Sequence, residues 1–443
     1  MARKPLCFVL MPFGVKSAGG EKPINFDAVY EDFIKPAIEE AGLDPIRADE
    51  EQAGGIIHKP MFERLVLCEY AIADLTTANA NVFYELGVRH AAKPRTTVLL
   101  FAEGQGRLPF DVAPLRAMPY SIGSKGGPTD KAAAIEALVK RLKSAKTAVD
   151  KDSPLFQLID EYPETKLAHE KTDIFREQVA YGEEIKGRLR KARKDGRDAI
   201  FEIEESLGSL TDEEAGVIVD LFISYRGVES WSDMVRMFDK IDATLQNTIL
   251  LREQYAMALN RDGDGEKAEE VLKLLIDERG PSSETYGILG RVYKDRWTVA
   301  KTAGKGVKAT GYLRQAIDAY LKGFEADWRD AYPGINALTL IHVQDHGDPR
   351  IPELRSVVEY AVKRKIANGV ADYWDHASLL ELSVLGGDQA ASEHYLSDAL
   401  AQVRESWEPK TTAKNLGFLL ESIPSESADR VWIQHIVNEL LGN

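Results

Sequence analysis

Over the first third of the chain, short hydrophobic runs alternate with longer segments in which apolar residues recur every three or four positions. Short runs of this kind are typical of buried strands, and the longer period is typical of helices that pack one face on a core. The expected strands are 6–13, 44–48, 70–75, 96–102 and 116–122, and the expected helices are 26–41, 57–68, 82–92 and 130–146. This alternation predicts βαβ units that build a five-stranded parallel sheet between helical layers.

From residue 210 onward the periodicity is helical throughout. Helical segments pair as 248–260 with 266–277, 283–295 with 311–325, and 372–385 with 388–403, closed by turns that contain glycine and interrupted by irregular inserts such as 296–310. A spacing of roughly 35 to 45 residues per pair, with Ala, Tyr and Leu at the packing positions, is typical of tetratricopeptide-like solenoids. Because such arrays usually bind other proteins, we expect a protein partner for this half of the chain.

These two patterns divide the chain into three parts. Residues 1–148 are expected to form the α/β domain, 149–209 a charged helical connector, and 210–443 the helical repeat domain. The fold class is therefore α/β plus all-α, with a Rossmann-like three-layer sandwich followed by a helical solenoid. The basic run 186–197 lies in the connector, where nearby acidic residues favour a solvated helix face over a phosphate-binding stripe.

The formal net charge of −15 argues against nucleic acid or an anionic membrane surface as the partner. No stretch approaches the ~20 apolar residues that a membrane span needs, and no secretion signal is recognisable at the N-terminus. Cys7 and Cys68 lack metal-ligand spacing and are expected to be reduced, buried thiols. We therefore expect a cytoplasmic protein with no metal and no cofactor.

The segment 71–90 (AIADLTTANANVFYELGVRH) is the densest candidate for chemistry. Asp74 ends a predicted strand and Glu85 lies in the following helix, at the edge where open α/β sheets bind ligands. We expect both carboxyl groups to face one crevice, with Asn79 or Asn81 capping the helix. The helix N-terminus favours an ionised acid, so Glu85 is expected to stay a carboxylate at neutral pH, as a nucleophile requires.

A purely structural interpretation of the same residues stands beside this one. Glu85 and Arg89 are four positions apart and fit a helix-surface ion pair, while Asp74 fits a loop-capping acid. His58 and His90 lie near the expected crevice without metal-ligand spacing, and His90 is expected to be a packing residue.

The motif ADLT..N.NVFYELGVRHA, after an N-terminal strand that ends in MPFG, resembles the nucleoside 2-deoxyribosyltransferase and TIR-like superfamily over about the first 120 residues. In the deoxyribosyltransferases the glutamate of the matching helix attacks the anomeric carbon of the sugar. The resemblance implies that Glu85 is the nucleophile and that Asp74 orients substrate or handles a proton. It also implies a substrate-binding set, which comprises Met11, Pro12, Phe13, Gly14, Asn79, Asn81 and Tyr84.

This chemistry would break an N-glycosidic bond. A carboxylate displaces a nucleobase or nicotinamide, and water or another acceptor resolves the glycosyl ester. The transferases carry a segment with serine or glycine before the glutamate, where this chain has residues 81–84 (NVFY). The choice among nucleoside, nucleotide and NAD-like substrates therefore stays open.

The segments 283–297 and 311–340 look like the TRAFs-binding region of the apoptosis-signal-regulating MAP kinase kinase kinases and their bacterial homologues. In those kinases too, a TIR-like domain precedes tetratricopeptide-like helices, so the resemblance implies an architecture for signalling or antiviral defence. Candidate contact residues here are Tyr286, Arg291, Tyr293, Lys294, Asp295 and the turn 332–336. Packing within the repeat explains Tyr286 and Tyr293 as well as ligand contact does.

Two functions follow from the sequence. The first is an N-glycosidic hydrolase or transferase acting on a nucleotide-like small molecule through Glu85, with the helical array regulating it. The alternative is a non-catalytic signalling scaffold whose N-terminal domain binds a nucleotide or a protein. A homo-oligomer is compatible with either.

Overall fold

The computed structural model describes residues 4–17, 23–47, 58–105, 117–147, 151–163, 169–211, 213–367, 371–403, 407–424 and 427–442. The chain divides into two compact units. Unit 1 comprises Met1–Glu229 and Lys240–Thr248, and unit 2 comprises Ser230–Asp239 and Ile249–Asn443. The division at residues 148 and 209 into domain, connector and repeat domain stays a prediction.

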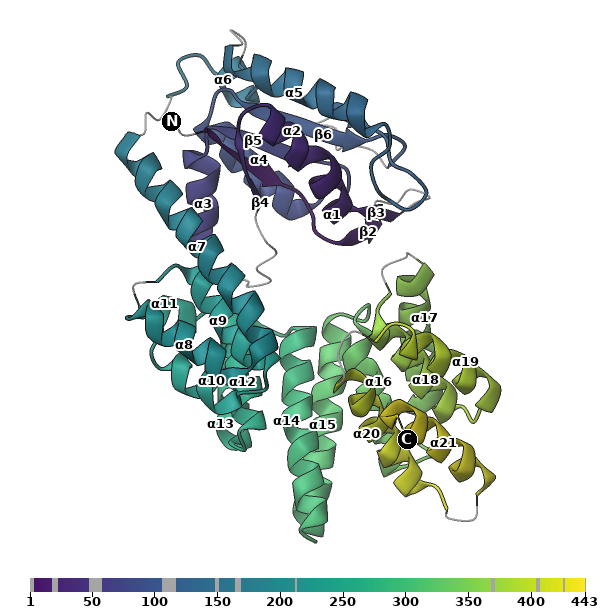
Figure 1. The fold of residues 1–443 in the computed structure, drawn as a ribbon. Helices are drawn as coiled ribbons and strands as arrows, with labels where there is room; N and C mark the ends of the chain where they lie inside the picture. Colours follow the sequence, from purple (N-terminus) through teal and green to yellow (C-terminus); the bar gives the residue numbers. More distant parts are fainter. Residues whose placement is uncertain are drawn as a thin grey trace. The chain divides into compact units, whose positions relative to one another are not determined.

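Unit 1 contains a five-stranded sheet in the order β4-β1-β5-β6-β7 (Figure 1). Every pairing in it is parallel, as predicted. Its strands are β1 (Leu6–Leu10), β4 (Asp44–Arg47), β5 (Tyr70–Asp74), β6 (Thr97–Ala102) and β7 (Met118–Tyr120). A separate antiparallel pair joins β2 (Val15–Ser17) to β3 (Pro23–Asn25).

Helices cover both faces of this sheet because alternate residues of β1 point in opposite directions. Cys7 and Val9 belong to one buried cluster and Phe8 and Leu10 to the other. The first cluster packs under α1 (Phe26–Val29), the π-helical turn η1 (Tyr30–Ile34), α2 (Lys35–Glu40) and α5 (Lys131–Thr147). The second packs under α3 (His58–Leu67) and α4 (Ala80–Ala92). The result is the predicted arrangement of a sheet between two helical layers.

The rest of unit 1 is helical. Its elements are α6 (Pro154–Leu158), α7 (His169–Asp195), α8 (Arg197–Leu207), α9 (Ala215–Gly227) and α11 (Ala243–Gln246). The basic run 186–197 lies mostly in α7, where Arg193 forms an ion pair with Asp220 of α9. Arg193, within this basic run, therefore contacts another helix of unit 1.

Unit 2 is a series of antiparallel helical hairpins that follow the short helix α10 (Trp231–Phe238). The three predicted pairs are present, and α16 with α17 and α20 with α21 add two more. The hairpin helices are α12 (Ile249–Arg261), α13 (Gly265–Arg279), α14 (Ser283–Thr302), α15 (Gly306–Ala326), α16 (Ala331–Gln344), α17 (Arg350–Ala367), α18 (Tyr373–Leu385), α19 (Gln389–Leu400), α20 (Trp407–Ser422) and α21 (Ala428–Leu441). The prediction of a helical C-terminal half is confirmed.

Close approach of α14 and α15 depends on a glycine. A Cβ atom added at Gly290 would lie 2.7 Å from the ring of Tyr320, closer than side chains pack. Both helices are longer than predicted, because the segment 296–310, expected as an insert, is largely helical and closes in a turn at Ala303–Lys305. Within the part of the chain that the structure describes, no helix is both long and apolar enough to cross a membrane.

Candidate functional site

Asp74 lies at the carboxyl end of β5 and is fully buried. The backbone N–H and the hydroxyl of Thr76 donate to Asp74 Oδ1 at 3.0 and 2.5 Å, and the Tyr120 hydroxyl donates to Oδ2 at 2.7 Å. Burial raises the pKa of Asp74, and these hydrogen bonds oppose the rise. Both carboxyl oxygens are thus engaged in shaping the β5–α4 loop, which supports the structural interpretation; a role in orienting substrate stays a prediction.

Asn79 is the cap of α4. Its side chain accepts hydrogen bonds from the backbone N–H groups of Asn81 at 2.9 Å and Val82 at 3.3 Å. Of the two asparagines considered, Asn79 therefore caps the helix, and Asn81 is exposed to solvent. Tyr84 is 56% exposed, and its ring meets the ring of Phe62 edge-on at 6.3 Å.

Glu85 lies in the second turn of α4 and is half-buried. Burial raises the pKa of its carboxyl group from 4.5 to about 7, and no described residue forms a hydrogen bond or ion pair with it. With a pKa of about 7, the carboxyl group of Glu85 is only partly ionised at neutral pH, and the full ionisation expected from the sequence stays a prediction. Glu85 is five residues, roughly 8 Å, past the start of the helix, beyond the turn in which the helix N-terminus favours a negative charge.

Arg89 is fully buried, so the surface ion pair with Glu85 that the spacing suggested is wrong. Its guanidinium donates to the backbone carbonyls of Leu65 at 2.9 Å, Cys68 at 2.7 Å and Glu69 at 3.1 Å. It also donates to the hydroxyls of two threonines at the start of β6, Thr96 and Thr97, at 3.3 Å each. Arg89 thus satisfies carbonyls at the C-terminal end of α3, where a positive charge is favourable.

The loop after β1 lies beside the loop after β5, because Leu10 pairs with Ala73. This loop contains the predicted substrate-binding residues, which are Met11, Pro12, Phe13 and Gly14; the first two are buried. Gly14 has a φ of 64°, in the left-handed region that favours glycine. The structure therefore brings this loop and Asp74 to one edge of the sheet.

Arg47, at the end of β4, holds this loop in place and was not identified from the sequence. Its guanidinium donates to the carbonyl of Pro12 at 3.0 Å and to the carboxylate of Asp27 at 2.9 Å, and lies 4.1 Å from the centre of the Phe13 ring. The backbone N–H of Gly14 donates to the same Asp27 oxygen at 3.2 Å. These partners are far apart in the sequence, so no local motif predicts that Arg47 contacts them.

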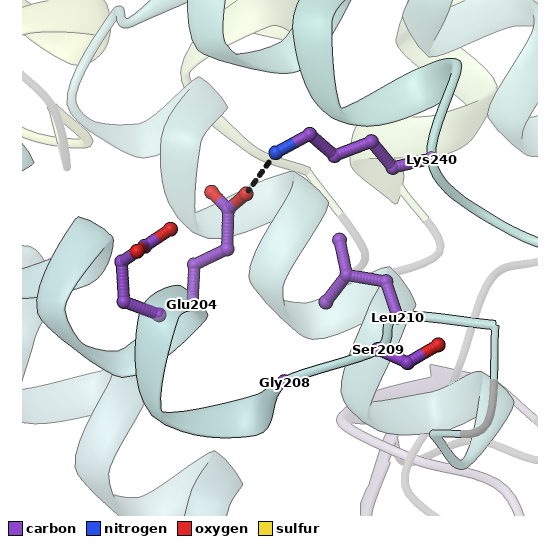
Figure 2. Close-up of a pocket in the computed structure, with 6 residues that line it drawn as sticks. Glu204, Gly208, Ser209, Leu210 and Lys240 are labelled. Carbon is purple, nitrogen blue, oxygen red and sulfur yellow. Dashed lines mark ion pairs between the residues drawn. The ribbon is translucent and has the colours of Figure 1, made fainter.

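A cavity of about 320 Å³ lies elsewhere in unit 1, beside the turn that follows α8 (Figure 2). Lys240 lies 3.8 Å from the carboxylate of Glu204, and the Tyr225 hydroxyl also donates to Glu204. The charges of this cavity thus pair largely with groups of the chain itself. The residues that line it are Glu204, Glu205, Gly208, Ser209, Leu210 and Lys240. None of these was predicted from the sequence as a site residue.

In unit 2 a buried polar cluster joins four helices. The ammonium group of Lys294 donates to the side-chain oxygens of Asn336 at 2.7 Å and Asn415 at 3.2 Å. Asn415 in turn donates to Glu381 at 3.2 Å. Burial lowers the pKa of Lys294 and raises that of Glu381. The cluster links α14, α16, α18 and α20.

The candidate contact residues of the array separate into two groups. Lys294 and Asn336 belong to the buried cluster, and Asp295 extends it by accepting from Asn260 at 2.8 Å. Tyr293 instead donates to Glu269 of α13 at 2.8 Å, and a Cβ atom at Gly323 would lie 3.1 Å from the Cβ of Tyr286. These contacts support the packing interpretation for the two tyrosines.

Comparison with known proteins identifies relatives of the greater part of the chain. The family model of the MAP3K TRAFs-binding domain matches residues 82–437. Human mitogen-activated protein kinase kinase kinase 6 is 25% identical in an alignment of 205 residues, and the match covers 43% of this chain. The aligned region spans only 15% of the length of that kinase.

Two solved structures are also similar. A thermophilic TPR protein of Thermus thermophilus has a TM-score of 0.35 and 16% identity, and the match covers 46% of this chain and 98% of the other. A tetratricopeptide repeat protein from Parabacteroides merdae has a TM-score of 0.33 and 12% identity, and the match covers 60% of this chain and 98% of the other.

Among the described residues, no group of three or more His, Cys, Asp or Glu side chains could hold a metal ion.

Proposed function

Since the chain belongs to the MAP3K TRAFs-binding domain family, we propose that it is a signalling scaffold whose helical array binds a protein partner. The observation that carries this proposal is the family match, which extends over residues 82–437 and so includes the hairpins from α12 to α20. The net charge of −15 also favours a protein over a nucleic acid as the partner.

A binding experiment tests the proposal. The tagged full chain is purified from its native host, a co-purifying protein is identified by mass spectrometry, and the complex is rebuilt from two purified proteins in a calorimeter. Gly334→Leu is the variant that disrupts the array, because a Cβ atom at Gly334 would lie 2.6 Å from Val358 and 2.8 Å from Phe324. Glu85→Gln in unit 1 is the control.

We expect the rebuilt complex to be lost in Gly334→Leu and unchanged in Glu85→Gln. If no purified protein binds the chain, or if Glu85→Gln abolishes binding and Gly334→Leu does not, the scaffold proposal is wrong. Circular dichroism of both variants reports how much of the array remains folded.

A second candidate function is cleavage of an N-glycosidic bond in a nucleotide-like small molecule by Glu85. The observation that favours it is the half-buried carboxyl group of Glu85. This group has a pKa of about 7 and forms no hydrogen bond or ion pair with a described residue. Perturbed carboxyl groups of this kind are common at catalytic sites, where they serve as acids, bases or nucleophiles. Met11, Pro12, Phe13, Gly14, Asn79, Asn81 and Tyr84 are the proposed substrate-binding residues.

Chromatography of reaction mixtures tests this second candidate. The full chain and Glu85→Gln are incubated with nucleosides, deoxynucleotides, NAD and NADP, and released base or nicotinamide is measured. Release by the native chain that is lost in Glu85→Gln would support Glu85 as the nucleophile. Release that survives in Glu85→Gln would show that Glu85 is not the nucleophile. If no compound releases a base or nicotinamide, the glycosidase candidate is wrong and only the scaffold function remains.

A further inference from the structure

The inner faces of four helices in unit 2 are occupied by contacts with one another. In addition to the polar cluster around Lys294, the rings of Trp297 on α14 and Phe418 on α20 lie 5.0 Å apart. Lys301 of α14 forms an ion pair with Glu421 of α20 at 2.5 Å. Since α14 and α20 belong to different hairpins with two others between them in the chain, these contacts fold the array back on itself. Outward-facing surfaces of the array are therefore the better place to seek a partner.

The end of the α14–α15 hairpin extends beyond the neighbouring helices of unit 2 (Figure 1). α14 has 20 residues and α15 has 21, whereas the following α16 has 14 and α17 has 18. The segment 296–314 contains basic residues and no acidic residue, in a chain whose net charge is −15. Its basic residues are Arg296, Lys301, Lys305, Lys308 and Arg314.

Three of these five cations are available to a partner. Arg296 and Lys301 form ion pairs with Glu269 and Glu421. The remaining three are exposed and form no ion pair within the described residues; they are Lys305, Lys308 and Arg314. Helix α15 adds to the positive potential, because its first turn has no acidic residue and its N-cap, Lys305, provides no side-chain cap.

Apolar side chains lie exposed at the same end of the hairpin. Val307, one residue into α15, is 93% exposed, and Val299 of α14 is 69% exposed. A single exposed valine needs no explanation, but two at the end of the hairpin that also carries Lys305 and Lys308 suit a partner segment that offers both carboxylates and apolar groups.

We propose that the end of the α14–α15 hairpin, defined by Val299, Lys305, Val307, Lys308 and Arg314, is a docking surface for an acidic segment of a partner protein. The three cations pair with carboxylates, and the two valines contact apolar side chains of the same segment. This inference rests on the proposed scaffold function and names the surface that performs it. A protein segment is favoured over RNA because the acidic remainder of the chain repels a phosphate backbone.

A direct test uses the full chain and a fluorescein-labelled synthetic peptide rich in glutamate and leucine, with binding followed by fluorescence anisotropy. The variant combines Lys305→Glu, Lys308→Glu and Arg314→Glu. Three exposed ion pairs of ordinary strength, each replaced by a like-charge contact, predict binding about tenfold weaker. Added salt should weaken binding of the wild type and have less effect on the variant.

The matched control changes three exposed cations elsewhere that also form no ion pair within the described residues. It combines Lys125→Glu, Arg279→Glu and Lys410→Glu, so its net charge changes by the same amount. Binding by this control within about twofold of the wild type would support the docking surface. Equal weakening in both variants would overturn the proposal, because net charge alone would then explain the effect.

Two further outcomes of the peptide experiment would also overturn the proposal: absence of peptide binding by the wild type at low salt, or tighter binding of an oligouridylate than of the peptide.

Val307→Ser, which changes no charge, is expected to weaken peptide binding about twofold to threefold. If the purified partner binds the array while the Lys305, Lys308 and Arg314 variant binds it equally well, the docking surface is wrong and the scaffold function stands. If no partner binds the array at all, the scaffold function itself has failed.

Discussion

Replacement of Arg89 by methionine should destabilise unit 1 by about 3 kcal/mol or more. The substitution keeps the apolar stem of the side chain but removes the guanidinium that donates to the carbonyls of Leu65, Cys68 and Glu69. The Glu69 carbonyl still accepts from the Thr96 hydroxyl, but the carbonyls of Leu65 and Cys68 lose this donor, and a buried acceptor left without a donor costs about 1–3 kcal/mol. Relief from burying the charge offsets part of this loss, so about 3 kcal/mol is the net effect that we expect.

The two cysteines of unit 1 provide the assay. Cys7 and Cys68 are fully buried, so a thiol reagent labels them only when this region opens. A loss of about 3 kcal/mol raises the population of the open form, and hence the labelling rate, by about 150-fold, since 1.36 kcal/mol corresponds to tenfold. Arg141→Met, at an exposed position on α5, is the control and should label within about twofold of the wild type.

The result also decides between the two interpretations of Arg89. A surface ion pair with Glu85 would be worth only about 0.3–0.5 kcal/mol, and its loss would change the labelling rate by about twofold. Labelling of Arg89→Met within a few fold of the wild type would therefore refute the assignment of Arg89 as the residue that secures the end of α3.

Two other predictions concern single residues. Gly290→Ala should destabilise unit 2 by about 1–3 kcal/mol because the new Cβ would lie 2.7 Å from the ring of Tyr320, whereas Gly311→Ala, with nothing within 4 Å, should stabilise it by up to about 1 kcal/mol. Urea unfolding followed by tryptophan fluorescence measures both, because every tryptophan lies at residue 231 or beyond; equal effects would contradict the packing argument. For Glu85, the folded pKa of about 7 lies above the ordinary 4.5, so its contribution to stability falls as pH rises between these values. Glu85→Gln should remove that slope and leave unit 1 roughly 2–3 kcal/mol more stable at pH 8 but unchanged near pH 4.5, as hydrogen exchange of β5 and α4 can measure; a variant less stable at pH 8 would contradict it.

The sheet and most hairpins could be predicted because their cores follow simple periods. In β1, successive residues from Leu6 to Leu10 are all apolar, as a strand buried on both faces requires. In α14, Gly290 falls at the position where Tyr320 of α15 approaches. The hairpins α16–α17 and α20–α21 were missed as pairs, although the segment 332–336 within the first was noted.

The extension of α14 and α15 could not be predicted for a different reason. Residues 298–311 are largely exposed, so hydrophobic periodicity is absent, and Gly304 and Gly306 resemble an irregular insert. Helical hydrogen bonding continues there because the two helices support one another along the hairpin. The proposed docking surface therefore lies in a segment that the sequence pattern did not predict to be helical.

The candidate site was only partly predictable because its decisive contacts join residues far apart in the sequence. Asp74 and Tyr120 are 46 positions apart, and Arg47 and Pro12 are 35 apart. The spacing of Glu85 and Arg89 favoured an ion pair, but the true partners of Arg89 are backbone carbonyls, which leave no signature in the sequence.

Photo-crosslinking in living cells of the native host shows whether the helical array binds a protein partner. A photoreactive amino acid is placed at position 308 or 360 of the array, or at the exposed position 141 of unit 1, and crosslinked proteins are identified by mass spectrometry. We expect one protein to be crosslinked from the array positions and not from position 141, and this crosslink to be lost from position 308 when Lys305 and Arg314 are changed to glutamate. Crosslinks from position 141 alone, or no crosslinks from any array position, would contradict it.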